Sequence, residues 1–231
     1  MAPTRTNPNA CGRALQNSPG FVPGPELERQ GSVVLVSKNK ALFEEGDSAD
    51  YVYKVVGGAL RTVRFLPDGR RHIASFFLPG DIFGYDGTAA YAYGVEAAAD
   101  ATVIRYPRHC FETMIENDSR AARRFLALVC GELASSQERL LLLGRKSAVE
   151  RLATFLLGMA DRMRSAESNA PEVDLPMSRS DIADYLGMTV ETVSRVLAQL
   201  RSTQVIDLPA AAHIVLLKRQ ALAALSAGAA A

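Results

Sequence analysis

The sequence predicts an α+β fold, with a β-roll followed by a long helix and then by a small domain of short helices and strands. Between residues 33 and 107, short β-type runs alternate with turn signals. After Pro107 the spacing of apolar residues becomes helical and stays so to Met163. A chain of 231 residues, 48% of them hydrophobic, can bury two modest cores, so we expect two domains.

Residues 1–30 are expected to form a disordered arm. Prolines recur through this stretch together with scattered Gly, Asn and Ser. Such a composition offers too little apolar surface to bury for an ordered structure.

Residues 31–107 are predicted to form the β-roll. Strands are expected at 33–36, 51–56, 60–66 and 72–77. Glycine and proline place turns at Glu45-Gly46-Asp47, Gly57-Gly58, Pro67-Asp68-Gly69 and Pro79-Gly80-Asp81. The clearest hairpin runs from Leu66 to Arg70.

Residues 108–144 are predicted to form one long helix with an apolar seam. The seam residues follow alternating steps of four and three, as in a coiled coil: Ala122, Leu126, Val129, Leu133, Ser136, Leu140 and Leu143. This spacing predicts a dimer interface, although a helix packed only on its own β-roll would also need an apolar stripe. Ser136 is uncharged, so nothing in the seam opposes dimerisation, whereas a buried carboxylate would.

Residues 145–231 are predicted to form the second domain, joined through a hinge at 144–147 where a glycine is followed by two cations. The pattern then indicates a helix at 149–163, a polar loop at 165–171, a strand at 173–176, two short helices and a hairpin at 205–217. That order is typical of a winged helix-turn-helix. The Ala-rich residues 222–231 fit either a helix or a frayed end.

The two short helices carry the signals of a helix-turn-helix. Ser178 and Asp181 have the spacing of a capping box, which predicts a helix at 181–186. Gly187 suits a left-handed corner, and Thr189 is a natural N-cap for the next helix. Apolar residues lie at spacings that would pack the two helices together: Ile182, Leu186, Val193, Val196, Leu197 and Leu200.

The outward face of the second helix is the candidate base-reading site. It carries Val190, Glu191, Ser194 and Arg195 in the turns that enter a major groove. Arg195 offers two donors to guanine, Glu191 can accept from cytosine N4, and Val190 can touch a thymine methyl. On spacing alone, Glu191 and Arg195 also fit a surface ion pair. Phosphate contacts are expected from the following residues: Ser178, Arg179, Ser180, Thr189 and Thr192.

Net charge, residue content and missing motifs limit the classes of protein that the sequence can encode. The formal net charge of +1 gives no broad basic field, so DNA binding rests on the motif. The three cysteines and three histidines are too scattered for a disulfide framework or a metal site. No apolar stretch has the length of a membrane span and no signal peptide is present, so we expect a cytoplasmic protein without a membrane partner. No nucleophile elbow, phosphate loop or HExxH motif is present, so we expect no enzyme.

The chain resembles the Crp/Fnr superfamily of transcription regulators from about residue 33 to 225. The matching stretches are 45–47, 55–58, 79–84, 145–152 and 177–195. Its Val190, Glu191, Ser194 and Arg195 fill the V-E-x-x-S-R pattern of the oxygen-regulator branch. The resemblance implies a cyclic-nucleotide-binding-like β-roll, a homodimer, recognition of TTGAT-N4-ATCAA palindromes in double-stranded DNA, and contact with RNA polymerase through Tyr85, Asp86 and Gly87.

Departures from the family pattern concern the sensor. Cyclic-nucleotide binders carry an Arg-Ser or Arg-Thr pair where residues 90–97 here have no arginine and include Glu96, and the family's preceding Glu is Asp81. Iron-sulfur members need four thiolates. Here Cys11 stands alone near the N-terminus, and Cys110 and Cys130 fit small semi-buried thiols better.

Without either cofactor, the chain is most similar to FixK-type members of the superfamily. This similarity implies a constitutive dimer that activates genes of microaerobic metabolism or nitrogen fixation. The alternative is a ligand-gated regulator of the same fold, whose β-roll binds an unidentified small effector or, through His72, haem.

Overall fold

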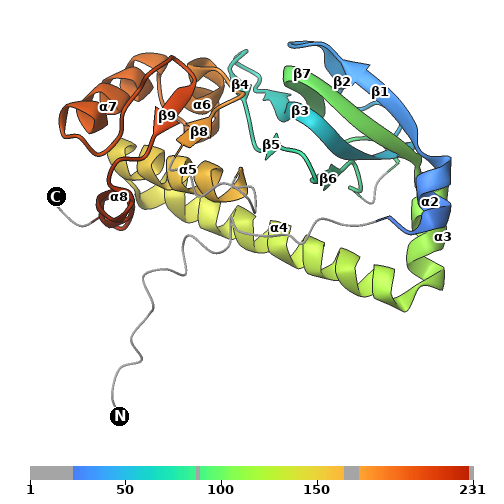
Figure 1. The fold of residues 1–231 in the computed structure, drawn as a ribbon. Coiled ribbons are helices and arrows are strands. Elements are labelled where there is room, and N and C mark those ends of the chain that lie inside the picture. The colour runs from blue at the N-terminus through green and yellow to red at the C-terminus, as the bar shows by residue number, and fades with distance from the viewer. Residues whose placement is uncertain (1–22, 87–88, 164–171, 229–231) are drawn as a thin grey trace. The chain divides into compact units, whose positions relative to one another are not determined.

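The structure, a computed structural model, describes residues 23–86, 89–163 and 172–228 (Figure 1). By its internal contacts the described chain forms two compact units. The first comprises residues 23–86, 89–130 and 176–185, and the second comprises residues 131–163, 172–175 and 186–228.

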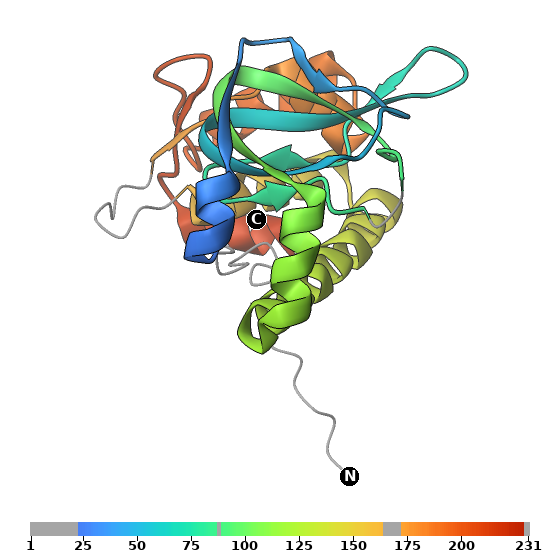
Figure 2. The same ribbon diagram turned by 90° about the vertical axis from the view of Figure 1, so that its right-hand side faces the viewer.

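The first unit contains the β-roll. Its strands are β1 (Ser32–Val36), β2 (Ala41–Phe43), β3 (Tyr51–Phe65), β4 (Arg71–His72), β5 (Phe76–Phe77), β6 (Ile82–Phe83) and β7 (Gly94–Pro107). The sheet follows the order β1-β7-β3-β4, while β2 pairs with β7 and both β5 and β6 pair with β3. Figures 1 and 2 show the long strands β3 and β7 running side by side through the roll.

Strand β3 is longer than the sequence predicted. The expected turn at Gly57-Gly58 was wrong, because both glycines lie inside β3, where its register against β7 shifts. Gly58 has φ +75°, and a Cβ there would lie 2.0 Å from the carbonyl oxygen of Asp100. Glycine therefore makes a bulge that bends one continuous strand, instead of ending it. The other three turns are confirmed by positive φ at Gly46, Gly69 and Gly80.

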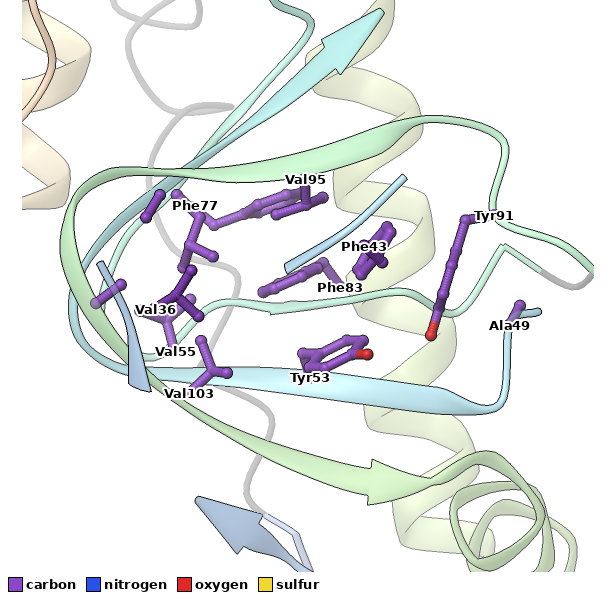
Figure 3. Close-up of a cluster of buried hydrophobic side chains, with 13 residues drawn as sticks. Val36, Phe43, Ala49, Tyr53, Val55, Phe77, Phe83, Tyr91, Val95 and Val103 are labelled. Atoms are coloured by element: carbon purple, nitrogen blue, oxygen red, sulfur yellow. The ribbon is translucent and has the colours of Figure 1, made fainter. Parts of the chain in front are cut away.

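Aromatic side chains fill the inside of the roll (Figure 3). Tyr91 stacks on Phe43 with 3.8 Å between the ring centroids, and Tyr53 stacks on Phe83 at 5.3 Å. The hydroxyl of Tyr91 donates to the carbonyl of Tyr51 at 2.8 Å. Burial is the main cause that raises the pKa of both Tyr53 and Tyr91. The core of the roll is thus an aromatic stack with its polar end satisfied.

A second apolar cluster lies where helices meet the roll. Helix α2 (Pro25–Gln30) contributes Leu27, which packs with Phe111 of α3 (Arg108–Asn117) and Leu128 of α4 (Ser119–Arg145). Residues 25–30 were expected to be disordered, but they form α2. This helix begins with a proline in its first helical position and buries Leu27. The earlier residues 1–22 of the expected arm lie outside the described residues.

The single helix expected at 108–144 is two helices. Asp118 has extended backbone angles and separates α3 from α4. Helix α4 then continues through Gly144 to Arg145. Cys110 is half-buried as expected, but Cys130 is exposed, because it lies outside the side of α4 that carries buried Ala121 and Leu128.

The second unit holds α5 (Ala148–Arg162), β8 (Glu172–Asp174), α7 (Val190–Ser202), β9 (His213–Val215) and α8 (Arg219–Ser226). Helix α6 (Arg179–Leu186) belongs to the first unit except for its last residue. The hairpin expected at 205–217 is reduced to a bridge between Asp207 and Val215, because β9 pairs with β8. Within the described ranges, no helix combines the length and the apolar character needed to cross a membrane.

Candidate nucleic-acid interface

The start of α6 is fixed by the predicted capping box. The amide of Asp181 donates to the hydroxyl oxygen of Ser178 at 3.1 Å, and the amide of Ser178 donates to the Asp181 carboxylate at 3.0 Å. The helix begins at Arg179, two residues earlier than expected. Both orphan amides are therefore satisfied at the entrance to the motif.

The carboxylate of Asp181 also forms ion pairs with arginines of the β-roll, which the sequence did not predict. Its carboxylate accepts from Arg61 of β3 at 3.0 Å and from Arg71 of β4 at 2.7 Å. Arg71 further pairs with Asp184 at 2.7 Å, and Arg61 pairs with Glu96 at 2.9 Å. Although burial lowers the pKa of Arg71, its hydrogen bond to Asp184 and the charges of both aspartates raise it overall. The sequence carried no signal for the pairs between the β-roll and α6, since Arg61 and Arg71 lie 110 to 120 positions away from their aspartate partners.

Helix α7 presents the predicted reading face. Thr189 caps it by accepting from the amide of Thr192 at 3.2 Å, as expected. Val193, Val196, Leu197 and Leu200 are buried, whereas Val190, Glu191 and Arg195 are exposed and Ser194 is half-buried. One side of α7 thus packs inward, and the candidate base-reading residues share the other.

Glu191 and Arg195 could instead have formed a surface ion pair, but in the described part of the chain they do not pair with each other. Instead, the pKa of Glu191 is lowered by the hydrogen bond from its own backbone amide and then by Thr189. A carboxylate in the first turn is also favoured by the helix dipole.

The candidate phosphate-contacting residues sit at the starts of α6 and α7. Ser178, Ser180 and Thr189 are exposed, while Arg179 and Thr192 are half-buried. The hydroxyls of Ser178 and Thr189 accept from backbone amides in their caps. The Ser178 hydroxyl in turn donates its proton to the Asp181 carboxylate at 2.8 Å, so a phosphate contact from Ser178 would have to replace that bond. The Thr189 hydroxyl shares a hydrogen bond with that of Thr192 at 3.1 Å in which either can be the donor, so one of the two keeps a proton for a phosphate oxygen.

The wing is the two-stranded sheet of β8 and β9. Asp174 lies opposite His213 in the register, and its carboxylate approaches Nδ1 of the ring at 2.6 Å. Glu172 lies 3.5 Å from Nε2. The hydrogen bond to Asp174 is the main cause that raises the pKa of His213.

The predicted seam on α4 is largely uncovered within this chain. Leu126, Leu133 and Leu140 are 62%, 60% and 74% exposed. Val129 and Ser136 are also exposed, while Ala122 and Leu143 are half-buried. An apolar row left in water along several turns is a surface suited to a partner.

The other candidate residues are those expected to contact RNA polymerase or to hold a cofactor. Tyr85 is half-buried and meets Phe125 edge-on at 5.2 Å, and Asp86 accepts from Tyr93 at 3.3 Å. Gly87 and Cys11 lie outside the described residues. His72 is half-buried on β4. In the part of the chain that the structure describes, no three His, Cys, Asp or Glu side chains gather as a metal site.

Comparison with known proteins places these features in a class. Residues 33–118 match the model of the cyclic nucleotide-binding domain, and residues 150–225 match the model of the Crp-like helix-turn-helix domain. The combination defines a transcription regulator with a sensor-type β-roll and a DNA-binding domain.

Individual proteins similar to this chain show to which group of transcription regulators it belongs. The chain is 39% identical over 201 residues to the nitrogen fixation regulation protein FixK of Azorhizobium caulinodans, covering 87% of this chain and 81% of that one. It is 39% identical to the transcriptional activatory protein AadR of Rhodopseudomonas palustris, covering 84% and 82%. The solved structure of FixK2 from Bradyrhizobium japonicum superimposes with a TM-score of 0.80 at 42% identity, covering 87% and 98%. The chain therefore belongs to the Crp/Fnr family, among its FixK-type regulators.

Proposed function

We propose that the protein is a cytoplasmic homodimer that binds TTGAT-N4-ATCAA palindromes and activates transcription. The observation that carries the proposal is the capped helix α7, whose outward face holds Val190, Glu191 and Arg195. A guanidinium can donate twice to guanine, a carboxylate can accept from cytosine, and a valine can contact a thymine methyl. These chemistries suit the TTGAT half-site and its complement.

The exposed seam of α4 supports the dimer. Leu126, Leu133 and Leu140 repeat on one face, so a second copy of α4 would remove all three from water at once. A two-fold dimer places two reading helices about one DNA turn apart, which matches a palindrome.

The interior of the β-roll supports action without cyclic AMP. Tyr91 and Val95 belong to the segment where cyclic-nucleotide binders hold phosphate, and here both side chains are buried in the aromatic core. Glu96 pairs with Arg61 and would repel a phosphate. The relatives named as regulators of nitrogen fixation and as an activatory protein support activation of such genes, with Tyr85, Asp86 and Gly87 proposed to contact RNA polymerase.

The test is operator binding by purified, ligand-free protein. We expect Arg195→Ala to weaken binding to the palindrome by about 1–3 kcal/mol and to relax the choice of base at the guanine position. Arg201→Ala is the matched control, since Arg201 is exposed in the last turn of the same helix and pairs with Asp207 at 3.4 Å. Equal binding by Arg195→Ala and wild type would refute the base assignment.

A ligand-gated regulator is the second candidate, favoured by the match of residues 33–118 to the cyclic nucleotide-binding domain. Such a regulator would bind its operator only when an effector is added, and cyclic AMP and haem are the first compounds to test.

A further inference from the structure

Arg151 lies in the first turn of α5 and donates to backbone carbonyls at four other positions in the second unit. Its Nη2 donates to the carbonyl of Leu143 at 2.8 Å, and its Nε donates to that of Lys146 at 2.9 Å. Its Nη1 donates to the carbonyl of Leu186 at 3.0 Å and, at the longer distance of 3.5 Å, to that of Gly187. All three guanidinium nitrogens are therefore engaged.

These acceptors lie at or just beyond helix ends, where carbonyls lack helical partners. In a continuing helix, the carbonyl of Leu143 would accept from the amide of Ser147. That amide instead donates to the Glu150 carboxylate at 2.6 Å, in the capping box that begins α5. The capping box thus releases the Leu143 carbonyl for Arg151.

Leu186 is the last residue of α6. The turn that follows lies against the same side chain, because a Cβ on Gly187 would meet Leu143 at 3.6 Å and Nη1 of Arg151 at 3.7 Å. Thr189, three residues after Leu186, caps α7. One guanidinium thus bonds the end of the seam helix and the turn that leads into the reading helix.

We infer that Arg151 is a positioning residue, which sets where α7 lies relative to the end of α4 and thereby the spacing of the two reading helices in the dimer. This inference rests on the proposed dimeric DNA binding. A planar guanidinium can donate to several carbonyls in fixed directions, whereas an ammonium acts as a point charge. The negative ends of α4 and α6 favour a cation at this place.

The experiment compares wild type, Arg151→Gln and Arg151→Lys on duplexes with two half-sites separated by three, four or five base pairs, and on a duplex with one half-site. Arg219→Gln is the control, because Arg219 lies in the same unit and makes its ion pair with Asp161 near the other end of α5. The fraction of active protein is determined for each variant by titration against saturating DNA.

We expect Arg151→Gln to lose about tenfold or more in affinity for the four-base-pair palindrome, since hydrogen bonds from a charged group are lost. Its preference among spacings should flatten. Affinity for the single half-site should change by less than about threefold, because the base-contacting residues are intact. Arg151→Lys should fail to restore the spacing preference, and Arg219→Gln should keep it.

Two results would overturn the inference: an unchanged spacing preference in Arg151→Gln, or an equal loss on the palindrome and on the single half-site. If wild type itself shows no preference for a palindrome, the proposed function fails instead. Amide hydrogen exchange then still decides the role of Arg151, since Arg151→Gln should speed exchange at both the end of α4 and residues 187–190. Faster exchange at neither place, or at one alone, would refute the coupling.

Discussion

The guanidinium of Arg61 and the carboxylate of Asp181 form an ion pair of 3.0 Å with side chains only 5% and 2% exposed. The two residues are separated by 120 positions, one on β3 and the other in the first turn of α6. Buried pairs of this kind are expensive to break from one side, because the remaining charge stays out of water.

We therefore expect Arg61→Met to destabilise the protein by about 3 kcal/mol, at the low end for a broken buried pair because Arg71 still faces Asp181. The control is Arg64→Met on the same strand, whose pair with Glu45 is exposed and is worth ~0–1 kcal/mol. Urea unfolding midpoints measure both. Similar losses in the two variants would contradict the role of burial.

The features that the sequence predicted correctly depend on residues that lie close together in the chain. The Ser178–Asp181 capping box, the Thr189 cap and the exposed face of α7 follow from spacings of three or four residues, and all were predictable. The hairpin at Leu66–Arg70 is confirmed by the hydrogen bond from the amide of Leu66 to the carbonyl of Arg70 at 2.9 Å.

What the sequence could not predict depends on distant partners. The pairing of Arg61 and Arg71 with α6 requires knowing which strand faces that helix. Gly58 looks like a turn residue until Asp100 is known to lie against it. The four carbonyls around Arg151 come from segments up to 36 residues away.

The bulge in β3 predicts a sharp contrast between neighbouring glycines. Gly58→Ala should destabilise by at least about 1–3 kcal/mol from the positive φ alone, and the approach to Asp100 adds a clash. Gly57→Ala is the control, since a Cβ there has nothing within 4 Å and its φ is not in the left-handed region. Thermal unfolding of the two variants measures the difference, and equal melting temperatures would argue against the bulge.

His213 predicts a pH-dependent wing. Because Asp174 and Glu172 raise its pKa in the folded state, the protonated ring stabilises the two-stranded sheet of β8 and β9. This contribution is fully present below the unfolded pKa of about 6.5 and is lost as the pH rises through the higher folded value. The melting temperature of wild type should exceed that of His213→Gln at pH 5.5, and the gap should narrow at pH 8.5. Asp174→Asn should remove most of this pH dependence, and a gap that widens with pH would have the wrong sign.

The exposed seam of α4 predicts which face holds the dimer together. Leu133 lies midway along the seam and is 60% exposed in the single chain. A glutamate there would place a carboxylate from each copy into an apolar interface, where an unpaired charge is strongly disfavoured. We expect Leu133→Glu to sediment as a monomer at micromolar concentration and to lose palindrome binding.

Ala127→Glu is the matched control for Leu133→Glu, because it adds the same charge to the same helix. Ala127 is exposed too, but at 100° per residue it points away from the seam. Analytical ultracentrifugation should show a dimer for Ala127→Glu and for wild type. If Leu133→Glu stays dimeric while Ala127→Glu dissociates, the interface lies on the opposite side of α4, and the heptad spacing reflects packing within one chain.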